Sequence, residues 1–333
     1  MRAISCGAPG KLALIDIAAP ELKPGWVRVG IRHIGICGTD YHIFEGKHPF
    51  LQYPRIMGHE LSGVVLDANG AAGLSDGDAV VINPYLPCYS CPACREGKTN
   101  CCETLTVIGV HGDGGMAEQI IMPEANLYRA EGLSLRDAAM VEFLAIGAHA
   151  VRRTVPRPGG QVLVVGGGPI GLGVAFFARI AGAEVTILDA AADKLEMARR
   201  FGFGAAALDE RDGAAFKAKM GSGFDAVFDA TGAIAAMNQA VSYCRNGGAL
   251  TLVGVVKGIL AWEDPEIHRR ELTIRASRNA TREDFDHVMA CIRNGSVPTD
   301  RLATHATSFD DVPANLPKWA HDRTGLIKAI ITL

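Results

Sequence analysis

Four cysteines between residues 88 and 102 lie at a spacing that suits one metal ion. Cys88, Cys91 and Cys94 follow one another at three-residue intervals, and Cys102 completes the pattern C-x-x-C-x-x-C-x7-C. Three thiols on one loop can converge on a tetrahedral ion, and a fourth closes the coordination sphere, which is typical of structural zinc. A run of free thiols and an iron–sulfur cluster are the alternatives. Cys101 adjoins Cys102, so register alone decides which of the two is the fourth ligand.

A glycine-rich turn opens the second half of the chain. Gly166, Gly168 and Gly171 form G-x-G-x-x-G after the apolar run QVLVV and at the start of a helix-like segment. The first glycine permits a tight turn, the second lets the backbone approach a pyrophosphate, and the third lets helix and strand pack closely. Amides at the helix N-terminus then bind the phosphates. The motif predicts a dinucleotide site; a glycine-rich turn without a ligand is the alternative.

An acidic residue follows this turn at the sequence separation typical of the residue that binds the adenosine ribose of a dinucleotide. Asp189 ends the next apolar run, EVTILD, and two alanines come after it. Its carboxylate would accept hydrogen bonds from the adenosine ribose and repel a 2′-phosphate, so the sequence favours NAD over NADP. The other coenzyme contacts that we expect lie in the turn and at later strand ends: Pro169, Ile170, Thr231, Gly232, Val253 and Val255.

Length, composition and charge exclude several classes of protein. With 333 residues the chain is long enough for two domains. The net charge of −3 argues against a general nucleic-acid binder. The longest apolar stretch, 162–178, contains three adjacent glycines and is short for a membrane span. We find no signal sequence and therefore expect a cytoplasmic protein, in which clustered cysteines bind metals or act in catalysis rather than form disulfides.

The pattern of predicted secondary structure changes near residue 140. Before it, short β-type runs are separated by glycine and proline, for example at 26–36, 62–70 and 77–84, which predicts a compact β-rich domain. After it, a helix is expected over 141–153, and strands and helices then alternate, which predicts a parallel sheet. The expected strands are 161–168, 184–190, 225–232 and 249–255, and the expected helices are 169–182, 193–202 and 233–248. A helix over 282–295 and a strand over 326–333 complete the prediction.

Two further metal-binding residue types lie far apart before the cysteine loop. Cys37 begins CGTDYH and His59 stands in GHE, 22 residues later. No local spacing rule brings them together, and each alone is more often structural. Together with the cysteine loop and GGGPIG, in this order, they make the whole chain resemble the zinc-containing medium-chain alcohol dehydrogenase family. The resemblance implies an α/β fold: a split GroES-like β-rich catalytic domain, 1–144 and 277–333, and a Rossmann doubly wound parallel-sheet coenzyme domain, 145–276.

The resemblance also implies a catalytic zinc site. Cys37 and His59 match two ligands, Glu60 matches the movable fourth ligand, and Glu142 stands where polyol dehydrogenases have a glutamate as third ligand. Here Glu142 precedes Phe143 rather than the family's usual proline, so an ordinary acid at a helix N-terminus is the alternative. An open position on such a zinc lowers the pKa of a bound hydroxyl. The chain would thus hold two zinc ions, one catalytic and one structural, and NAD.

A proton relay is implied by the residues that follow Cys37. Thr39 and His42 match a hydroxyl and an imidazole that carry the alcohol proton to solvent through the coenzyme ribose, and imidazole suits this because its pKa lies near neutral pH. Asp40 matches an acid that orients His59 through its other ring nitrogen. A helix cap at Thr39 and a surface histidine at 42 are the alternatives.

The substrate prediction depends on short stretches. SCPACREGKTNCCE, VIGVHGDGG, HAVRR and SRNAT resemble bacterial L-galactonate and L-gulonate 5-dehydrogenases, which oxidise a secondary hydroxyl of a sugar acid. A small polyhydroxylated substrate with a carboxylate needs a cationic pocket, since a guanidinium binds a carboxylate with two hydrogen bonds. The candidate substrate residues are Lys47, His48, His111, Arg278 and Asn279.

Other functions remain open at this stage. An L-threonine or sugar-alcohol dehydrogenase, of the sorbitol or galactitol type, is the alternative enzyme, and a non-catalytic binding relative of the fold is the alternative class. We expect no nucleic-acid or membrane partner. The resemblance further implies a homodimer or homotetramer.

Overall fold

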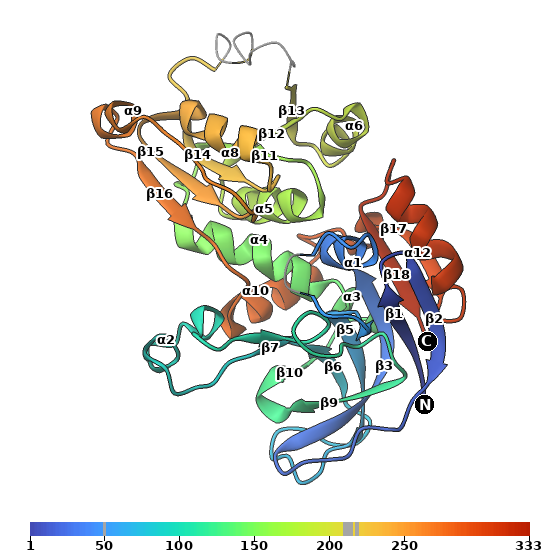
Figure 1. Ribbon diagram of the computed structural model, residues 1–333. Helices are drawn as coiled ribbons and strands as arrows, with labels where there is room; N and C mark the ends of the chain where they lie inside the picture. Colours follow the sequence, from blue (N-terminus) through green and yellow to red (C-terminus); the bar gives the residue numbers. More distant parts are fainter. Residues whose placement is uncertain (49–50, 209–215, 217–219) are drawn as a thin grey trace. The chain divides into compact units, whose positions relative to one another are not determined.

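The computed structural model describes residues 1–48, 51–208, 216 and 220–333 (Figure 1). The chain divides into two compact units, Met1–Glu142 with Val288–Leu333, and Phe143–His287. Both passages between the units lie inside helices, α4 (Val141–Thr154) and α10 (Arg282–Arg293). The domain borders expected from the sequence, 144/145 and 276/277, remain a prediction.

The first unit is built mainly from antiparallel strands. Its strands are β1 (Arg2–Ala8), β2 (Lys11–Asp16), β3 (Trp26–Ile36), β4 (Arg55–Ile56), β5 (Glu60–Asp67), β6 (Ala79–Ile82), β7 (Tyr85–Leu86), β8 (Thr106–Val107), β9 (Gln119–Pro123), β10 (Leu127–Arg129), β17 (Ala303–Ser308) and β18 (Lys328–Thr332). Its helical segments are α1 (Gly38–Phe44), α2 (Pro92–Arg95), η1 (Thr99–Cys101), η2 (Glu124–Asn126), α3 (Leu135–Ala138), α11 (Thr299–Leu302) and α12 (Val312–His321). Among the described residues the largest sheet runs β10-β6-β5-β3-β18-β17, and β9 also pairs with β3. The long strand β3 thus organises the unit.

The register around the end of β3 brings distant segments together. Gly35 pairs with Glu60 on β5, and Ile36 pairs with Ala329 on β18. A Cβ on Gly35 would lie 2.2 Å from Oε2 of Glu60, so only glycine lets the glutamate side chain cross this strand. The first residue after β3 is Cys37, which therefore lies beside the start of β5.

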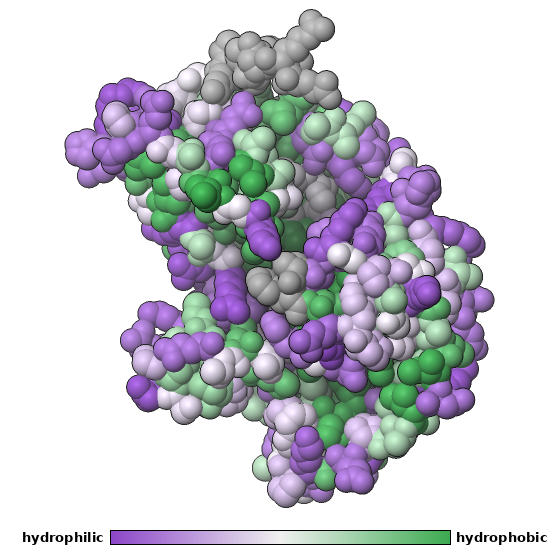
Figure 2. Space-filling model, viewed as in Figure 1, coloured by the Kyte–Doolittle hydropathy of each residue, from purple (hydrophilic) through white to green (hydrophobic). Residues whose placement is uncertain are grey.

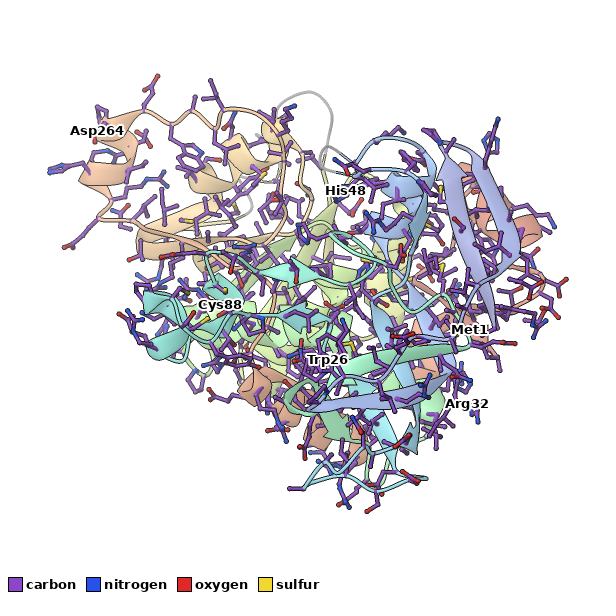
Figure 3. All side chains as sticks on the ribbon, turned by 60° about the horizontal axis from the view of Figure 1, so that its bottom comes forward. Met1, Trp26, Arg32, His48, Cys88 and Asp264 are labelled. Atoms are coloured by element: carbon purple, nitrogen blue, oxygen red, sulfur yellow. The ribbon has the colours of Figure 1, made fainter. Side chains whose placement is uncertain are left out.

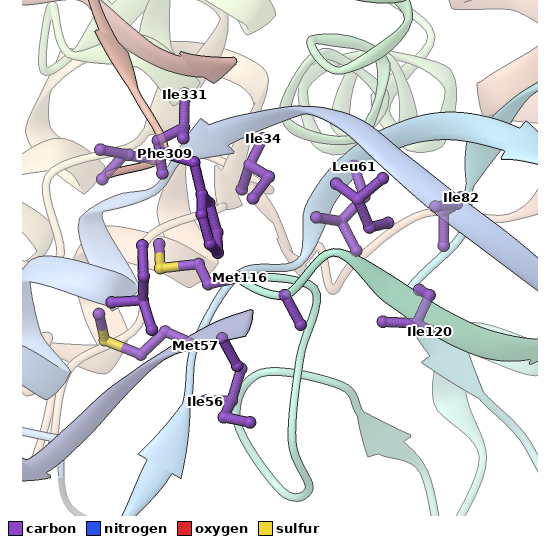
Figure 4. Packing of buried hydrophobic residues seen from close by; sticks show 14 of the residues in the cluster. Ile34, Ile56, Met57, Leu61, Ile82, Met116, Ile120, Phe309 and Ile331 are labelled. Atoms are coloured by element: carbon purple, nitrogen blue, oxygen red, sulfur yellow. The ribbon is translucent and has the colours of Figure 1, made fainter. Parts of the chain in front are cut away.

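Branched and sulfur-containing side chains fill the core of this unit. Figure 4 shows how Ile34, Leu61, Met116, Phe309 and Ile331 pack against one another. They come from strands and loops far apart in sequence, and each buried side chain of this size contributes roughly 1.5–3 kcal/mol. This packing holds the ends of β3, β5 and β18 in one fixed arrangement.

The second unit contains the predicted parallel sheet. Its strands are β11 (Gln161–Val165), β12 (Glu184–Asp189), β13 (Gly204–Ala207), β14 (Phe224–Asp229), β15 (Cys244–Leu252) and β16 (Thr273–Ala276). Its other helical segments are α5 (Pro169–Ile180), α6 (Ala192–Arg200), α8 (Ile234–Ala240), η3 (Val241–Tyr243) and α9 (Asp264–Arg269). Within the described residues the strand order is β13-β12-β11-β14-β15-β16, and every pairing is parallel. The predicted α/β class is confirmed.

Several predicted element bounds in this unit were wrong: the strands expected over 161–168 and 225–232 end at Val165 and Asp229. The helix expected over 233–248 ends at Ala240, and residues 244–248 belong to β15 instead. Two glycines, Gly247 with φ +69° and Gly248, disfavour a helix here, and Cys244 pairs with Phe224 on β14. The strand expected over 249–255 ends at Leu252, because the next two amides both bond to the carbonyl of Asp229.

The second unit has a polar surface at helix α9. Helix α9 has no buried residue, and it forms the purple hydrophilic group at the upper left of Figure 2. Among the helices of the described residues, none has the length and apolar character needed to cross a bilayer.

Candidate active site

Cys37 is fixed at the N-terminus of helix α1. It is the N-cap residue, and its amide donates to Oδ2 of Asp40 at 2.8 Å, one half of a capping box. The other oxygen of Asp40 accepts from the Gly58 amide at 3.2 Å, so this fully buried carboxylate ties α1 to the residue before His59. Burial raises the pKa of Asp40 despite the nearby His59.

The ligand atoms of Cys37, His59 and Glu60 gather in one place. They lie within 4.8 Å of one another, and His59 and Glu60 are buried. Nδ1 of His59 lies 3.9 Å from Oδ1 of Asp40. Burial disfavours a charge on His59, yet Cys37, Asp40 and Glu142 outweigh it and raise the pKa of His59 well above its ordinary value. This donor set attracts positive charge, and its thiol, imidazole and carboxylate are the ligand types that zinc prefers.

The sequence prediction missed a buried partner of Glu60. Nζ of Lys328 contacts both carboxylate oxygens of Glu60, at 2.7 and 2.6 Å, and the carbonyl of Ile36 at 3.2 Å. Burial opposes the charge on Lys328, but Glu60 and Cys37 raise its pKa. A lysine inside the apolar run LIKAIITL was the available signal, since such a charge is buried only when it is paired.

Glu142 lies in the first turn of α4 and is also buried. Its Oε1 accepts a hydrogen bond from the hydroxyl of Tyr85, while Oε2 has no partner among the described residues. Burial, and to a smaller extent the charge of Glu60, raise the pKa of Glu142 to about 7. The nearby His59 acts in the opposite direction. Glu142 is not one of the group within 4.8 Å, but its unpartnered oxygen fits a further ligand for a cation there.

The four predicted thiols of the cysteine loop come together. Cys88, Cys91, Cys94 and Cys102 have sulfur atoms within 4.8 Å of one another, whereas Cys101 is exposed outside the group. The loop carries α2, and Figure 3 labels Cys88 at its start.

Backbone amides prepare this cluster for a cation. Hydrogen bonds from Ser90, and the amide of Cys91, lower the pKa of Cys88 to about 5. The amide of Cys88 in turn donates to Sγ of Cys102 at 3.2 Å. Burial raises the pKa of Cys94 to about 12, so a metal must displace that proton when it binds. The thiols fit a closed structural zinc site.

The glycine-rich turn has the geometry that its motif predicts. Gly166 has φ +100°, and a Cβ on Gly171 would lie 1.8 Å from the Gly166 carbonyl oxygen. A Cβ on Gly168, the N-cap of α5, would meet nothing within 4 Å. Pro169 and Ile170 form the first turn of that helix. The open space above Gly168, at the N-terminus of a helix, suits a phosphate group.

The ribose-binding acid stands at the end of the neighbouring strand. Oδ2 of Asp189 accepts from the Gly167 amide at 2.6 Å, and Oδ1 accepts from the Ala191 amide at 2.8 Å. Lys194, which the sequence prediction did not include, lies near the same turn: a Cβ on Gly167 would be 3.2 Å from Cβ of Lys194 and 3.4 Å from Oδ2 of Asp189. The backbone thus fixes the orientation of Asp189.

The remaining predicted coenzyme residues lie at the same edge of the sheet. Asp229 ends β14, and its carboxylate accepts from the amide and hydroxyl of Thr231. Gly232 has φ +63° and lies against the carbonyl of Val255. Val253 is buried, whereas Val255 is 88% exposed. An exposed valine at the carboxyl edge of a parallel sheet, where such sheets bind ligands, is suited to contact a coenzyme.

The predicted relay residues lie on α1. The thiol of Cys37 donates to the Thr39 hydroxyl at 3.7 Å, and Thr39 is half-buried. His42 is exposed in the last turn of the helix. Partial burial, and next the charge of Arg323, lower the pKa of His42 below its ordinary value, which favours the neutral imidazole that a proton acceptor requires.

The predicted substrate residues are divided between the two units. In the first unit, Lys47 pairs with Glu45 at 2.9 Å, and Nδ1 of His111 accepts from the Val107 amide at 3.0 Å. Partial burial, and the neighbouring His111, lower the pKa of His48. In the second unit, Arg278 and Asn279, the latter with φ +51°, lie between β16 and α10. Their roles stay predictions.

Comparison with known proteins identifies the family. The model of the alcohol dehydrogenase GroES-like domain matches residues 23–132, and that of the zinc-binding dehydrogenases matches residues 169–294. All of the chain aligns with 99% of the L-galactonate-5-dehydrogenase of Escherichia coli strain K12, at 40% identity. The chain belongs to the zinc-containing medium-chain alcohol dehydrogenase family. This dehydrogenase is therefore a zinc-dependent enzyme that acts on CH–OH groups.

Solved structures agree on the fold of the dehydrogenase. An alcohol dehydrogenase from E. coli CFT073, complexed with NADH, aligns over 100% of this chain and 99% of its own, with a TM-score of 0.94 and 28% identity. A zinc-binding dehydrogenase from Sinorhizobium meliloti 1021, bound to NADP, covers the same shares with a TM-score of 0.90 and 27% identity. Because both coenzymes occur in similar structures, the choice between them depends on residues of this chain.

Proposed function

We propose that this enzyme oxidises a secondary alcohol of a sugar acid, at the 5-position of an L-galactonate or L-gulonate type substrate, and transfers the hydride to NAD. The observation that carries the proposal is the 40% identity, over the whole chain, to an L-galactonate-5-dehydrogenase. The gathered Cys37, His59 and Glu60, with Glu142 nearby, support a catalytic zinc site rather than a non-catalytic binding protein.

The residues of the site divide the reaction between them. When bound, zinc polarises the alcohol oxygen and the nicotinamide accepts the hydride. Cys37, His59 and Glu142 would hold the metal. Asp40 accepts from the amides of Cys37 and Gly58 and so fixes the backbone beside both Cys37 and His59, although its Oδ1 lies 3.9 Å from Nδ1 of His59, too far for a hydrogen bond. Thr39 would receive the alcohol proton through a hydrogen bond, and His42, whose lowered pKa favours the neutral form, would take it towards solvent.

We propose NAD as the coenzyme because of Asp189. Two backbone amides hold its carboxylate at the end of β12, where a 2′-phosphate would meet its negative charge. Steady-state kinetics with both coenzymes test this. We expect NAD to be preferred by at least about 100-fold in kcat/KM, about 2.7 kcal/mol, and Asp189→Ser to reduce that preference. Equal use of NADP by the unaltered enzyme would contradict the proposal.

Substrate kinetics on the purified enzyme test the rest. L-galactonate and L-gulonate should give the highest kcat/KM in a panel that also contains sorbitol, galactitol and L-threonine. Activity on threonine alone, or on the two alcohols alone, would replace the sugar-acid proposal.

A substitution at Arg278 tests how the substrate carboxylate is held. We expect Arg278→Gln to raise the KM for the sugar acid about tenfold, because it removes a charge-assisted bidentate contact, and to leave the KM for an alcohol substrate unchanged. A KM that rises equally for both substrates would assign Arg278 another role.

A further inference from the structure

The orientation of the Glu142 carboxylate is set by one phenol. The hydroxyl of Tyr85 donates to Oε1 of Glu142, and both side chains are buried, at 4% and 3% exposure. Oε2 has no hydrogen-bond partner in the described part of the chain. A buried carboxylate oxygen without a donor is costly, so one oxygen is satisfied by protein and the other is kept for a positive charge.

Tyr85 is itself held from several sides. Its amide donates to Oδ1 of Asn83 at 3.0 Å, and its carbonyl accepts from Nδ2 of Asn126 at 2.6 Å. Nδ2 of Asn83 donates in turn to the hydroxyl of Tyr128 at 2.8 Å. All four side chains are buried. Oδ1 of Asn126 has no partner among the described residues, but the two bonds to the backbone of Tyr85 hold that backbone from both sides. We therefore expect the carboxylate of Glu142 to follow the phenol rather than the reverse.

The same strand begins the cysteine loop. Tyr85 lies on β7, three residues before Cys88, and pairs with Val107 on β8, five residues after Cys102. The β7–β8 pairing therefore clamps both ends of the four-cysteine loop at the residue that contacts Glu142. In this way the segment that carries the structural site also contributes to the catalytic one.

We propose that Tyr85 is a positioning residue for the catalytic zinc: its hydroxyl holds Oε1 of Glu142 so that Oε2 binds the metal beside Cys37 and His59. The inference rests on the proposed function, because it takes Glu142 as a zinc ligand. Hydrogen bonds to a ligand from outside the coordination sphere typically change metal affinity about 10–100-fold.

Zinc release from the intact, zinc-loaded enzyme tests the proposal. Tyr85→Phe removes only the hydroxyl, and Tyr128→Phe is the matched control, since it removes the buried hydroxyl that accepts from Asn83 in the same network. Zinc per chain is measured by elemental analysis after dialysis against a graded series of chelator concentrations. We expect Tyr85→Phe to lose one zinc at a chelator strength about 10–100-fold lower than the unaltered enzyme. The second zinc, and both zincs of Tyr128→Phe, should be released as in the unaltered enzyme.

The possible outcomes separate this inference from the function on which it rests. The positioning role is wrong if Tyr85→Phe retains its first zinc as the unaltered enzyme does, or if it loses both zincs together. It is also wrong if Tyr128→Phe loses one zinc as early as Tyr85→Phe does. Glu142→Gln is measured alongside. If Glu142→Gln releases the first zinc early and Tyr85→Phe does not, only the role of Tyr85 fails. If Glu142→Gln also retains zinc, Glu142 is not a ligand and the metal set of the proposed function fails too.

Discussion

At the scale of single residues, the catalytic site is built on buried charge. Asp40, Glu60, Glu142 and Lys328 are all nearly inaccessible to solvent. Such groups are tolerated only when they are paired or bind a metal, because removing a charge from water is expensive. Glu60 is paired with Lys328, whereas Oε2 of Glu142 has no partner among the described residues, which suits a site that holds a cation.

The pairing of Lys328 with Glu60 predicts a large stability effect. Lys328→Met should destabilise the protein by about 3 kcal/mol or more, because it leaves a buried carboxylate without its partner. Urea unfolding measures this. Lys98→Met is the control, since Lys98 forms an exposed pair with Glu96 at 2.8 Å, and its loss should cost less than about 1 kcal/mol. The double variant Lys328→Met/Glu60→Gln should recover part of the loss; equal effects at both lysines would contradict the prediction.

The pKa of His42 predicts a shift in the pH profile. Arg323 lowers this pKa, and it also binds Glu45 at 2.8 Å, whose negative charge acts in the opposite direction. Arg323→Gln removes the positive charge, so the pKa of His42 should rise. Because the proposed relay requires a neutral His42, the acid limb of kcat/KM for alcohol oxidation should move to higher pH. Arg129→Gln, at an exposed pair with Asp78, is the control and should leave the limb in place. An unmoved limb in Arg323→Gln would remove His42 from the relay.

At the scale of elements, turns and strand ends carry the functional groups. Cys37 follows β3, the glycine turn follows β11, Asp189 ends β12, and Asp229 ends β14. A strand fixes the direction of the backbone until its last residue, so the first residues beyond it are both well placed and free to contact a ligand.

Two glycines of one turn should respond differently to substitution. Gly171→Ala places a Cβ 1.8 Å from a backbone oxygen, so it should destabilise the protein by about 1–3 kcal/mol or more. Gly168→Ala meets no atom of the chain and should leave the unfolding temperature unchanged while it weakens coenzyme binding. Thermal unfolding without coenzyme and fluorescence titration with NADH measure the two effects. Unchanged NADH binding in Gly168→Ala would mean that no phosphate approaches this residue.

At the scale of the whole molecule, the chain connects the two units twice, within helix α4 and within helix α10. One carboxylate links these two helices. Asp284 on α10 accepts from Nδ1 of His149 at 2.8 Å and Nε of Arg152 at 2.7 Å, both on α4. It also accepts from the amide and hydroxyl of Thr281. This network fixes α4, the helix that carries Glu142 at its first turn, to α10.

This network predicts a pH-dependent stability. Burial alone would raise the pKa of Asp284, but the bonds from His149 and Arg152 outweigh it and hold the pKa well below its ordinary value. A depressed carboxyl pKa stabilises the fold above the ordinary pKa of about 3.9 and loses this contribution as the pH falls. Asp284→Asn should therefore cost about 2 kcal/mol at pH 7, below the value for a fully buried pair because Arg152 is partly exposed. The difference in unfolding free energy between the unaltered enzyme and Asp284→Asn should become smaller below about pH 4.

Thermal unfolding at several pH values measures this difference. Asp225→Asn is a comparison within the same unit, because Asp225 also binds two arginines, Arg157 and Arg245, and has its pKa lowered to about 2. Both variants should lose stability at pH 7. Only Asp284→Asn should also weaken retention of the zinc that we propose Glu142 to bind. A cost for Asp284→Asn that is independent of pH would contradict the electrostatic explanation.

The sequence alone determined what depends on local spacing. The cysteine loop, the glycine turn with Asp189 and the alternation of strands and helices each follow from contacts within a few residues, or from a period that the sequence displays. Bounds failed where a tertiary contact overrode the local signal, as when Cys244 joined β15 by pairing with Phe224.

Only the tertiary structure decided which distant charges meet. No spacing rule brings Lys328 to Glu60, or Tyr85 to Glu142, across 268 and 57 residues. The register of β3 with β5 and β18, set by core packing along the strands, places the first pair, and a buried amide network places the second. These contacts form only after strands and loops that are distant in sequence have packed together. A short stretch of sequence therefore cannot predict them.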